Sequence, residues 1–264
     1  MKIGYFADGK WSHEAFKRLI ADKEIAIAFI CARFDTQDTT LKDFATQYQI
    51  DYIKHENINT KNFLGKVARY QCDLFVSMSF NQIFKKDIIN LPPLKTINCH
   101  AGKLPFYRGR NILNWALIND EPEFGITVHY VDEGIDTGDI ILQKTYTITD
   151  EDTYATILEK AYMNCAKILY KAIEMFKTGV PTAIEQKNIH PVGFYCTQRK
   201  DGDEVLDWNL TSRKIFNFVR AVCEPGPKAR AFLNGIEMKI NKIEMIPGAP
   251  EYICSIGVIL QKDA

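Results

Sequence analysis

The chain has 264 residues, of which 46% are hydrophobic and 25% are charged. This composition supports a substantial core in one large domain, or in a main domain with a smaller appendage, and argues against extended disorder. Lysine and arginine total 33 and aspartate and glutamate total 33, so the overall charge gives no electrostatic reason for a polyanionic partner such as nucleic acid.

The sequence carries no pattern typical of a membrane-spanning segment or a metal-binding site. Its longest apolar run, 25–32, is far shorter than the roughly 20 residues of a membrane-spanning helix. The first residues lack the apolar core of a secretory signal, so we expect a cytoplasmic protein with no membrane association. Seven cysteines without a CxxC pair are typical of reduced thiols, and five histidines without an HExxH motif predict no metal site.

Strands and helices are expected to alternate in the first part of the chain. Apolar runs predict strands over 2–7, 25–31, 50–53, 73–79 and 96–99. Amphipathic spacing predicts helices over 12–20, 41–48 and 61–70, with Ser12 as the N-cap of the first. This alternation favours right-handed βαβ units and a mostly parallel sheet, in which function gathers at the carboxyl ends of the strands.

The pattern changes in the second part. A helix is predicted over 111–119, strands over 125–132 and 139–147, and a long helix over 153–177 that ends at Gly179-Val180-Pro181. A short helix over 212–221 and strands over 229–233, 237–246 and 252–260 follow. We therefore expect an α/β catalytic domain over 1–180, a linker over 181–200, and a small β-rich C-terminal domain over 201–264.

Two common kinds of site are disfavoured by their missing motifs. No GxGxxG follows the first strand, and neither Gly9-Lys10-Trp11 nor Gly102-Lys103-Leu104 has the spacing of a P-loop. No GxSxG elbow is present, and no cysteine lies in a recognisable nucleophile context. Dinucleotide binding, P-loop chemistry and covalent catalysis therefore have little support.

A polar pair stands at the carboxyl end of the strand expected over 96–99. Asn98 and His100 are two residues apart, so in an extended chain their side chains project from the same face. An amide donor can stabilise a carbonyl oxygen as it gains negative charge, while an imidazole beside it moves a proton. Without further context, the pair could equally be a turn cap and a hydrogen-bonded loop histidine.

The surrounding motifs decide between these readings. The stretch NCHAGKLPFYRGRNILNWALINDEPEFGITVHYVDEGIDTGDI over 98–140 resembles the 10-formyltetrahydrofolate-dependent formyltransferases, which include methionyl-tRNA formyltransferase, glycinamide ribonucleotide transformylase and the sugar N-formyltransferases. The NxH, LPxxRG and DxGxDTG motifs occur together at matching separation. The resemblance implies a Rossmann-like domain with Asn98, His100 and Asp136 as catalytic residues: Asn98 stabilises the oxyanion, His100 moves the proton and Asp136 orients the imidazole.

The same resemblance implies where the formyl donor, 10-formyltetrahydrofolate, binds. It points to the loop after the strand over 73–79 and to the segment that leads to Asp136, namely Met78, Ser79, Phe80, Gln82, Ile83, Phe84, Val131, Asp132, Glu133 and Gly134. In the family, backbone groups hold most of the pterin. Met78, Phe80, Ile83 and Phe84 could therefore equally be core residues.

The acceptor is expected to be a nucleotide-linked amino sugar. Residues 201–264 carry eight lysines or arginines against nine aspartates or glutamates, which argues against methionyl-tRNA because phosphate contacts need a basic surface. The stretch RGRNILNW resembles enzymes that formylate 4-amino sugars linked to UDP or dTDP for surface glycans, a group that is commonly dimeric. We expect the substrate to contact Gly9, Lys10, Trp11, Lys103, Arg108, Arg110 and Asn111. Methionyl-tRNA and glycinamide ribonucleotide are the alternatives.

Overall fold

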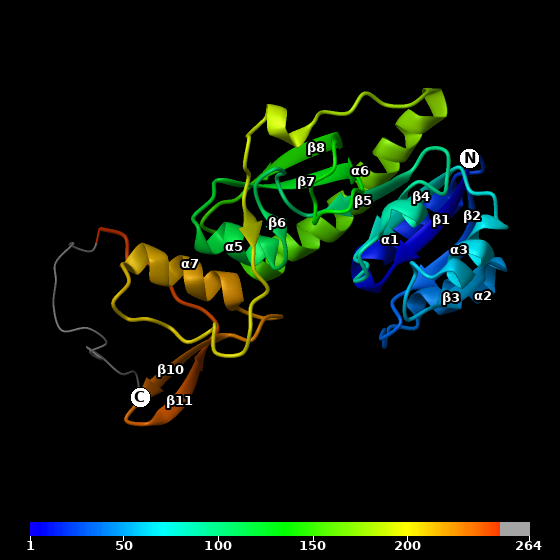
Figure 1. The fold of residues 1–264 in the computed structure, drawn as a ribbon. Helices are drawn as coiled ribbons and strands as arrows, with labels where there is room; N and C mark the ends of the chain where they lie inside the picture. The colour runs from blue at the N-terminus through cyan, green and yellow to red at the C-terminus, as the bar shows by residue number, and fades with distance from the viewer. Residues whose placement is uncertain (249–264) are drawn as a thin grey trace.

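The computed structural model describes residues 1–248, and a seven-stranded sheet lies at its centre. The strand order is β3-β2-β1-β4-β5-β7-β8 (Figure 1). The strands are β1 (Lys2–Ala7), β2 (Ala26–Ala32), β3 (Asp51–Lys54), β4 (Leu74–Met78), β5 (Thr96–His100), β7 (Glu123–Tyr130) and β8 (Ile140–Thr147). The strands β1 to β5 are parallel, while β7 and β8 add to β5 in antiparallel fashion. The expected α/β fold with a mostly parallel sheet is confirmed.

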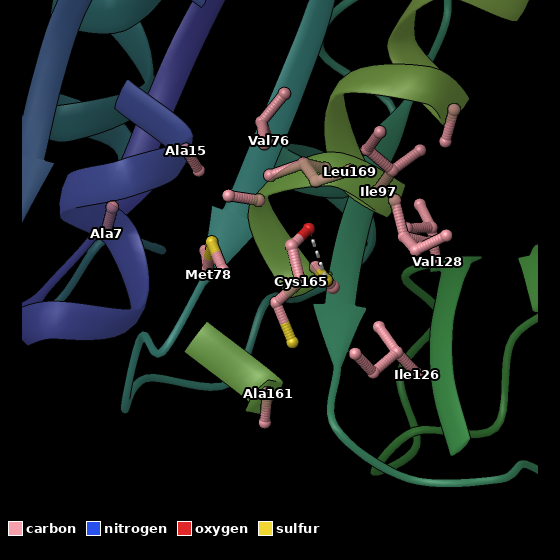
Figure 2. Packing of buried hydrophobic residues seen from close by; sticks show 14 of the residues in the cluster. Ala7, Ala15, Val76, Met78, Ile97, Ile126, Val128, Ala161, Cys165 and Leu169 are labelled. Atoms are coloured by element: carbon pink, nitrogen blue, oxygen red, sulfur yellow. Dashed lines mark hydrogen bonds between the residues drawn. The ribbon is translucent and has the colours of Figure 1, made fainter. Parts of the chain in front are cut away.

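Helices cover both faces of the sheet because the strands are apolar on both. One face packs against α1 (Gly9–Ala21), α2 (Thr40–Tyr48), α5 (Ile112–Ile118) and α6 (Tyr154–Thr178), and the other against α3 (Lys61–Ala68) and α4 (Lys86–Ile89). Figure 2 shows Val76 and Ile97, from β4 and β5, close to Leu169 of α6. This double cover is what buried parallel strands require.

The C-terminal region consists of a helix and a hairpin. The helix α7 (Ser212–Val222) lies beside α5 (Figure 1), and Asn114 of α5 donates a hydrogen bond of 2.6 Å to the carbonyl of Ala221. The antiparallel pair β10 (Ala229–Leu233) and β11 (Ile236–Ile240) follows. A two-residue turn joins them, and its residues Asn234 and Gly235 both have positive φ, as such tight hairpins require. The small β-containing C-terminal region is confirmed.

Two predicted elements have a boundary that differs from the structure by three residues or more. The helix expected from Ser12 begins at Gly9, with Asp8 at the N-cap and no side-chain capping bond, while Ser12 is buried and donates to the carbonyl of Gly9. The strand expected over 237–246 ends at Ile240. The strand expected over 252–260 lies outside the described residues.

Three short elements near the proposed site were not predicted. The strand β6 (Arg108–Gly109) pairs in parallel with β9 (Tyr195–Cys196), and the short helix η1 (Gln186–Asn188) precedes β9. The segment over 181–200 therefore packs along the LPxxRG loop. Within residues 1–248, no helix has both the length and the apolar character needed to cross a membrane.

Candidate active site

The polar pair Asn98 and His100 ends strand β5. Ile97 and Cys99 belong to the core beneath α6, so the alternation of the strand turns Asn98 and His100 to the opposite face. Both residues line a cavity of about 930 Å³ at the carboxyl end of the sheet. A ligand site at this end is the usual arrangement for a parallel α/β sheet.

Asp136 reaches the same point from the loop between β7 and β8. Its Oδ2 lies 3.5 Å from His100 Nδ1 and accepts a hydrogen bond of 2.9 Å from the backbone N–H of Gly109. The loop is tied internally because Asp132 Oδ1 accepts hydrogen bonds from Gly134 N and Thr137 Oγ1. The three residues expected to be catalytic are thus brought together.

His129 is a fourth member of the cluster that we did not predict. It lies on β7 opposite Asn98 in the strand register and is only 2% exposed. Its Nδ1 is 2.7 Å from the carbonyl oxygen of Tyr130, which makes Nδ1 a donor. Its Nε2 lies 3.3 Å from Asn98 Nδ2 and 3.5 Å from Asp136 Oδ1. The alternation of the predicted strand over 125–132 beside NxH was the available signal.

The charge on Asp136 is strongly stabilised. Burial alone would raise the pKa of Asp136, but His100, His129 and the N–H of Gly109 outweigh it and hold that pKa well below its usual range. Asp136 is therefore ionised at neutral pH. An ionised carboxylate between two imidazoles can orient both rings and stabilise either one when it carries a proton.

The ring of His100 is held from both sides. Its Nε2 lies 2.7 Å from the carbonyl oxygen of Tyr107, and its Nδ1 faces Asp136. A Cβ at Gly102 would collide with the same ring and with the carbonyl oxygen of Tyr107, so this close approach requires a glycine. The orientation of the His100 ring is thus fixed by contacts with its own loop and with Asp136.

Most residues expected to bind the donor or the acceptor line the cavity. They are Trp11, Met78, Ser79, Phe80, Gln82, Ile83, Phe84, Arg110, Asn111, Val131, Asp132 and Gly134. Within this set, Met78 and Phe84 are buried core residues, while Ile83 is 59% exposed and presents an apolar surface. Further lining residues that were not predicted from the sequence include Arg33, Tyr154, Tyr195 and Gln198.

Five predicted residues lie away from the cavity lining. They are Gly9, Lys10, Lys103, Arg108 and Glu133. Lys103 pairs with Glu123 at 2.6 Å, and Arg108 is only 8% exposed and donates to Gln186. The expected gathering of four cations at the site is therefore not observed: Arg110 lines the cavity, whereas Lys10, Lys103 and Arg108 do not. No group of three or more histidines, cysteines or carboxylates in the described part of the chain is arranged to hold a metal ion.

Comparison with known proteins identifies the family. The model of the formyl transferase family matches residues 12–173, and the model of its C-terminal domain matches residues 199–264. The chain belongs to the formyl transferase family. It is 35% identical, over 212 residues, to methionyl-tRNA formyltransferase from Thermodesulfovibrio yellowstonii, covering 80% of this chain and 68% of that protein. Matches to other methionyl-tRNA formyltransferases cover as little as 64% of their length.

Solved structures of sugar formyltransferases share the fold. A sugar N-formyltransferase from a Shewanella species aligns with a TM-score of 0.73 at 19% identity, covering 93% of this chain and 99% of that one. WlaRD, a sugar 3N-formyl transferase crystallised with dTDP and 5-N-formyl-THF, aligns with a TM-score of 0.67 at 23% identity. The alignment covers 89% of this chain and 83% of that one.

Proposed function

We propose that this formyltransferase moves a formyl group from 10-formyltetrahydrofolate to the amino group of a sugar linked to UDP or dTDP. In this reaction a C–N bond forms between the formyl carbon and the amine, and the bond from the formyl carbon to folate N10 breaks. The amine loses one proton, and folate N10 gains one. The proposed machinery must therefore stabilise charge on the formyl oxygen and carry one proton between two nitrogens.

Three residues divide this work. Asn98 would donate its amide N–H to the formyl oxygen as negative charge develops, which is how oxyanion donors lower a barrier. Since His100 Nε2 is hydrogen-bonded to the carbonyl of Tyr107, its Nδ1, beside Asp136, is the nitrogen that would accept the proton of the attacking amine or return it to the departing nitrogen. Asp136 would orient the imidazole and stabilise its charged form, and its 3.5 Å distance from His100 Nδ1 supports this role.

The donor would lie against the loops that follow β4 and β7. Phe80 and Ile83 from the first loop and Val131 and Asp132 from the second all line the cavity. The exposed side chain of Ile83 offers an apolar surface of the kind that a flat heteroaromatic ring packs against. This fit supports a reduced folate in the cavity, with its formyl group toward Asn98.

The acceptor would enter between α5 and the strand β9. Arg110 and Tyr195 line this part of the cavity, and Arg110 Nη1 donates to Gln198 Oε1 at 2.8 Å. A guanidinium suits the phosphates of a nucleotide, since it presents several donors in a fixed plane. Tyr195 is 53% exposed and offers a ring face for stacking on a base.

The charge pattern of the C-terminal region is the observation that favours a small acceptor over tRNA. Residues 201–248 contain seven lysines and arginines. Five of them form ion pairs with carboxylates: Arg213, Arg220, Lys228, Arg230 and Lys242. A cation that already pairs with a carboxylate is less available to a phosphate, and this pairing supports a small acceptor over a long phosphate backbone.

Methionyl-tRNA is the second candidate acceptor. The relative at 35% identity is a methionyl-tRNA formyltransferase, and the C-terminal domain model of the family matches this chain. The two candidates place different demands on the C-terminal region. A tRNA must contact it over a wide area, whereas a nucleotide sugar fits within the cavity.

A formylation assay on the full chain separates the candidates. The protein is incubated with 10-formyltetrahydrofolate and, in parallel, with a panel of UDP- and dTDP-linked amino sugars, methionyl-tRNA and glycinamide ribonucleotide. We expect turnover of at least one nucleotide sugar, and its rate should change little between low and moderate salt. Turnover of methionyl-tRNA alone, falling steeply as salt rises, would overturn the proposal in favour of the second candidate.

A further inference from the structure

Gln186 is a buried glutamine in the segment over 181–200, outside the motifs that define the family. It is 3% exposed, and its amide makes four hydrogen bonds. The Nε2 donates to the carbonyl oxygens of Asp136 and Gly138, both at 2.8 Å. The Oε1 accepts from Arg108 Nε at 3.1 Å and from Arg108 Nη2 at 2.7 Å. The full hydrogen-bonding capacity of the side chain is used.

Through its Oε1, Gln186 binds Arg108, which belongs to strand β6. Arg108 is buried, and its Nη1 donates to the carbonyl of Val192 at 3.2 Å. The next residue of β6, Gly109, supplies the backbone N–H that binds Asp136 Oδ2. Gln186 therefore connects two elements that touch Asp136 from different sides: the loop that carries it and the strand that binds its carboxylate.

The loop around Asp136 needs such support. Asp136 has a positive φ of 55°, a backbone conformation that a non-glycine residue adopts at a cost. Gly138 packs so closely on the carbonyl of Tyr130 that a Cβ there would collide with it. The carbonyls of Asp136 and Gly138 point into the protein, where the amide of Gln186 satisfies them.

We propose that Gln186 is a positioning residue, which fixes the backbone of the Asp136 loop so that the Asp136 carboxylate faces His100 and His129. This inference rests on the proposed catalytic role of Asp136. Gln186 itself lines no part of the main cavity and acts through the loop. The segment that joins the two family domains thereby takes part in building the site.

A glutamine is specifically suited to this position. Only a primary amide offers two donors to the carbonyls and two acceptor lone pairs to the guanidinium in one plane. A glutamate would keep an ion pair with Arg108 but would offer no donor to Asp136 O or Gly138 O. Gln186→Glu thus distinguishes the two sets of hydrogen bonds, because it retains the contact to Arg108 of β6 and removes the contacts to the loop that carries Asp136.

The test combines kinetics with NMR of the imidazole rings. The five histidines of the chain give few ring signals, and substitution of each histidine assigns them. In Gln186→Glu, we expect kcat to fall at least tenfold with the donor KM within twofold, and the ring ¹⁵N and ¹³C signals of His100 and His129 to move. The signals of His13 and His55 should stay in place. Lys187→Ala, at an exposed neighbouring residue, is the matched control and should resemble the wild type.

A second variant is needed in case Gln186→Glu does not fold. Gln186→Met has a similar length and no hydrogen-bonding group, so the His100 and His129 signals should also move in this variant. Unchanged kcat and unchanged signals for His100 and His129 in a folded Gln186 variant would overturn the inference. The NMR readout needs no acceptor, so it remains decisive even if no nucleotide sugar is turned over and the proposed function fails.

Discussion

Asn98 and His129 face each other across the antiparallel pair β5–β7, with Asn98 Nδ2 3.3 Å from His129 Nε2. With a single proton on Nδ1, where it donates to the carbonyl of Tyr130, the ring of His129 leaves Nε2 as an acceptor for Asn98; a second proton would place an N–H on Nε2, which faces Asp136 Oδ1 at 3.5 Å. In the singly protonated form, one N–H of the Asn98 amide is held by His129. The amide group is thereby oriented with its second N–H available to the cavity, as an oxyanion donor requires.

Removal of His129 should weaken catalysis by releasing this amide. We expect His129→Ala to lower kcat by about tenfold, the effect of losing one orienting hydrogen bond of about 1.4 kcal/mol. His129→Gln, whose carbonyl can still accept from Asn98, should recover part of the loss. His13→Ala is the control, since His13 pairs with Asp38 instead. A wild-type kcat in His129→Ala would show that Asn98 needs no such support.

Replacement of Asn98 should have a larger effect. Loss of an oxyanion donor typically lowers kcat by roughly 100- to 1000-fold, and we expect Asn98→Ala to fall in this range with little change in donor affinity. Asn98→Asp keeps the size of the side chain but places a carboxylate near the formyl oxygen, so its loss should be at least as large. Steady-state kinetics with fluorescence titration of the folate separates the two quantities. A rise in the folate Kd with unchanged kcat would contradict the assigned role.

The lowered pKa of Asp136 predicts how stability changes with pH. Because this pKa is depressed in the folded protein, the ionised carboxylate stabilises the fold fully above the unfolded value of about 4, and this contribution is lost as the pH falls toward the folded pKa. Asp136→Asn lacks the contribution. The difference in Tm between wild type and Asp136→Asn should therefore shrink as thermal melts are taken from about pH 6 to about pH 3. Glu133→Gln in the same loop controls for the loss of one charge, and a constant Tm difference would refute the assignment.

The parts of the fold that local pattern controls were predicted well. The buried strands β1, β2 and β4 are largely apolar runs, and α6 is a long amphipathic pattern with a threonine cap and a glycine stop. Elements that depend on tertiary contact were missed. The strands β6 and β9 are two residues each and exist only because they pair with each other across a large sequence separation.

In the candidate site too, residues within local motifs were predicted, and contacts between distant residues were not. Asn98, His100 and Asp136 were found because they lie within sequence motifs, and the structure brings them together. Arg108 was expected at the substrate because it is charged and belongs to LPxxRG. Its guanidinium is instead buried against Gln186, a residue 78 positions away. No local pattern reveals such a partner, because a buried arginine and an exposed one have the same neighbours in sequence.

Arg110 is the residue through which acceptor binding can be tested most directly. It lines the cavity from the end of β6, and its donor bond to Gln198 leaves the rest of the guanidinium for a phosphate. We expect Arg110→Ala to raise the KM for the nucleotide sugar at least tenfold, since such charge-assisted contacts contribute about 1.5 to 3 kcal/mol, while the donor KM stays unchanged. The KM of Arg110→Lys for the nucleotide sugar should lie between those of the wild type and Arg110→Ala, because lysine keeps the charge without the planar donors. Lys144→Ala, on the exposed side of β8, removes a positive charge away from the cavity and serves as the control. An equal rise in both KM values would indicate that Arg110 supports the cavity as a whole and does not contact the acceptor.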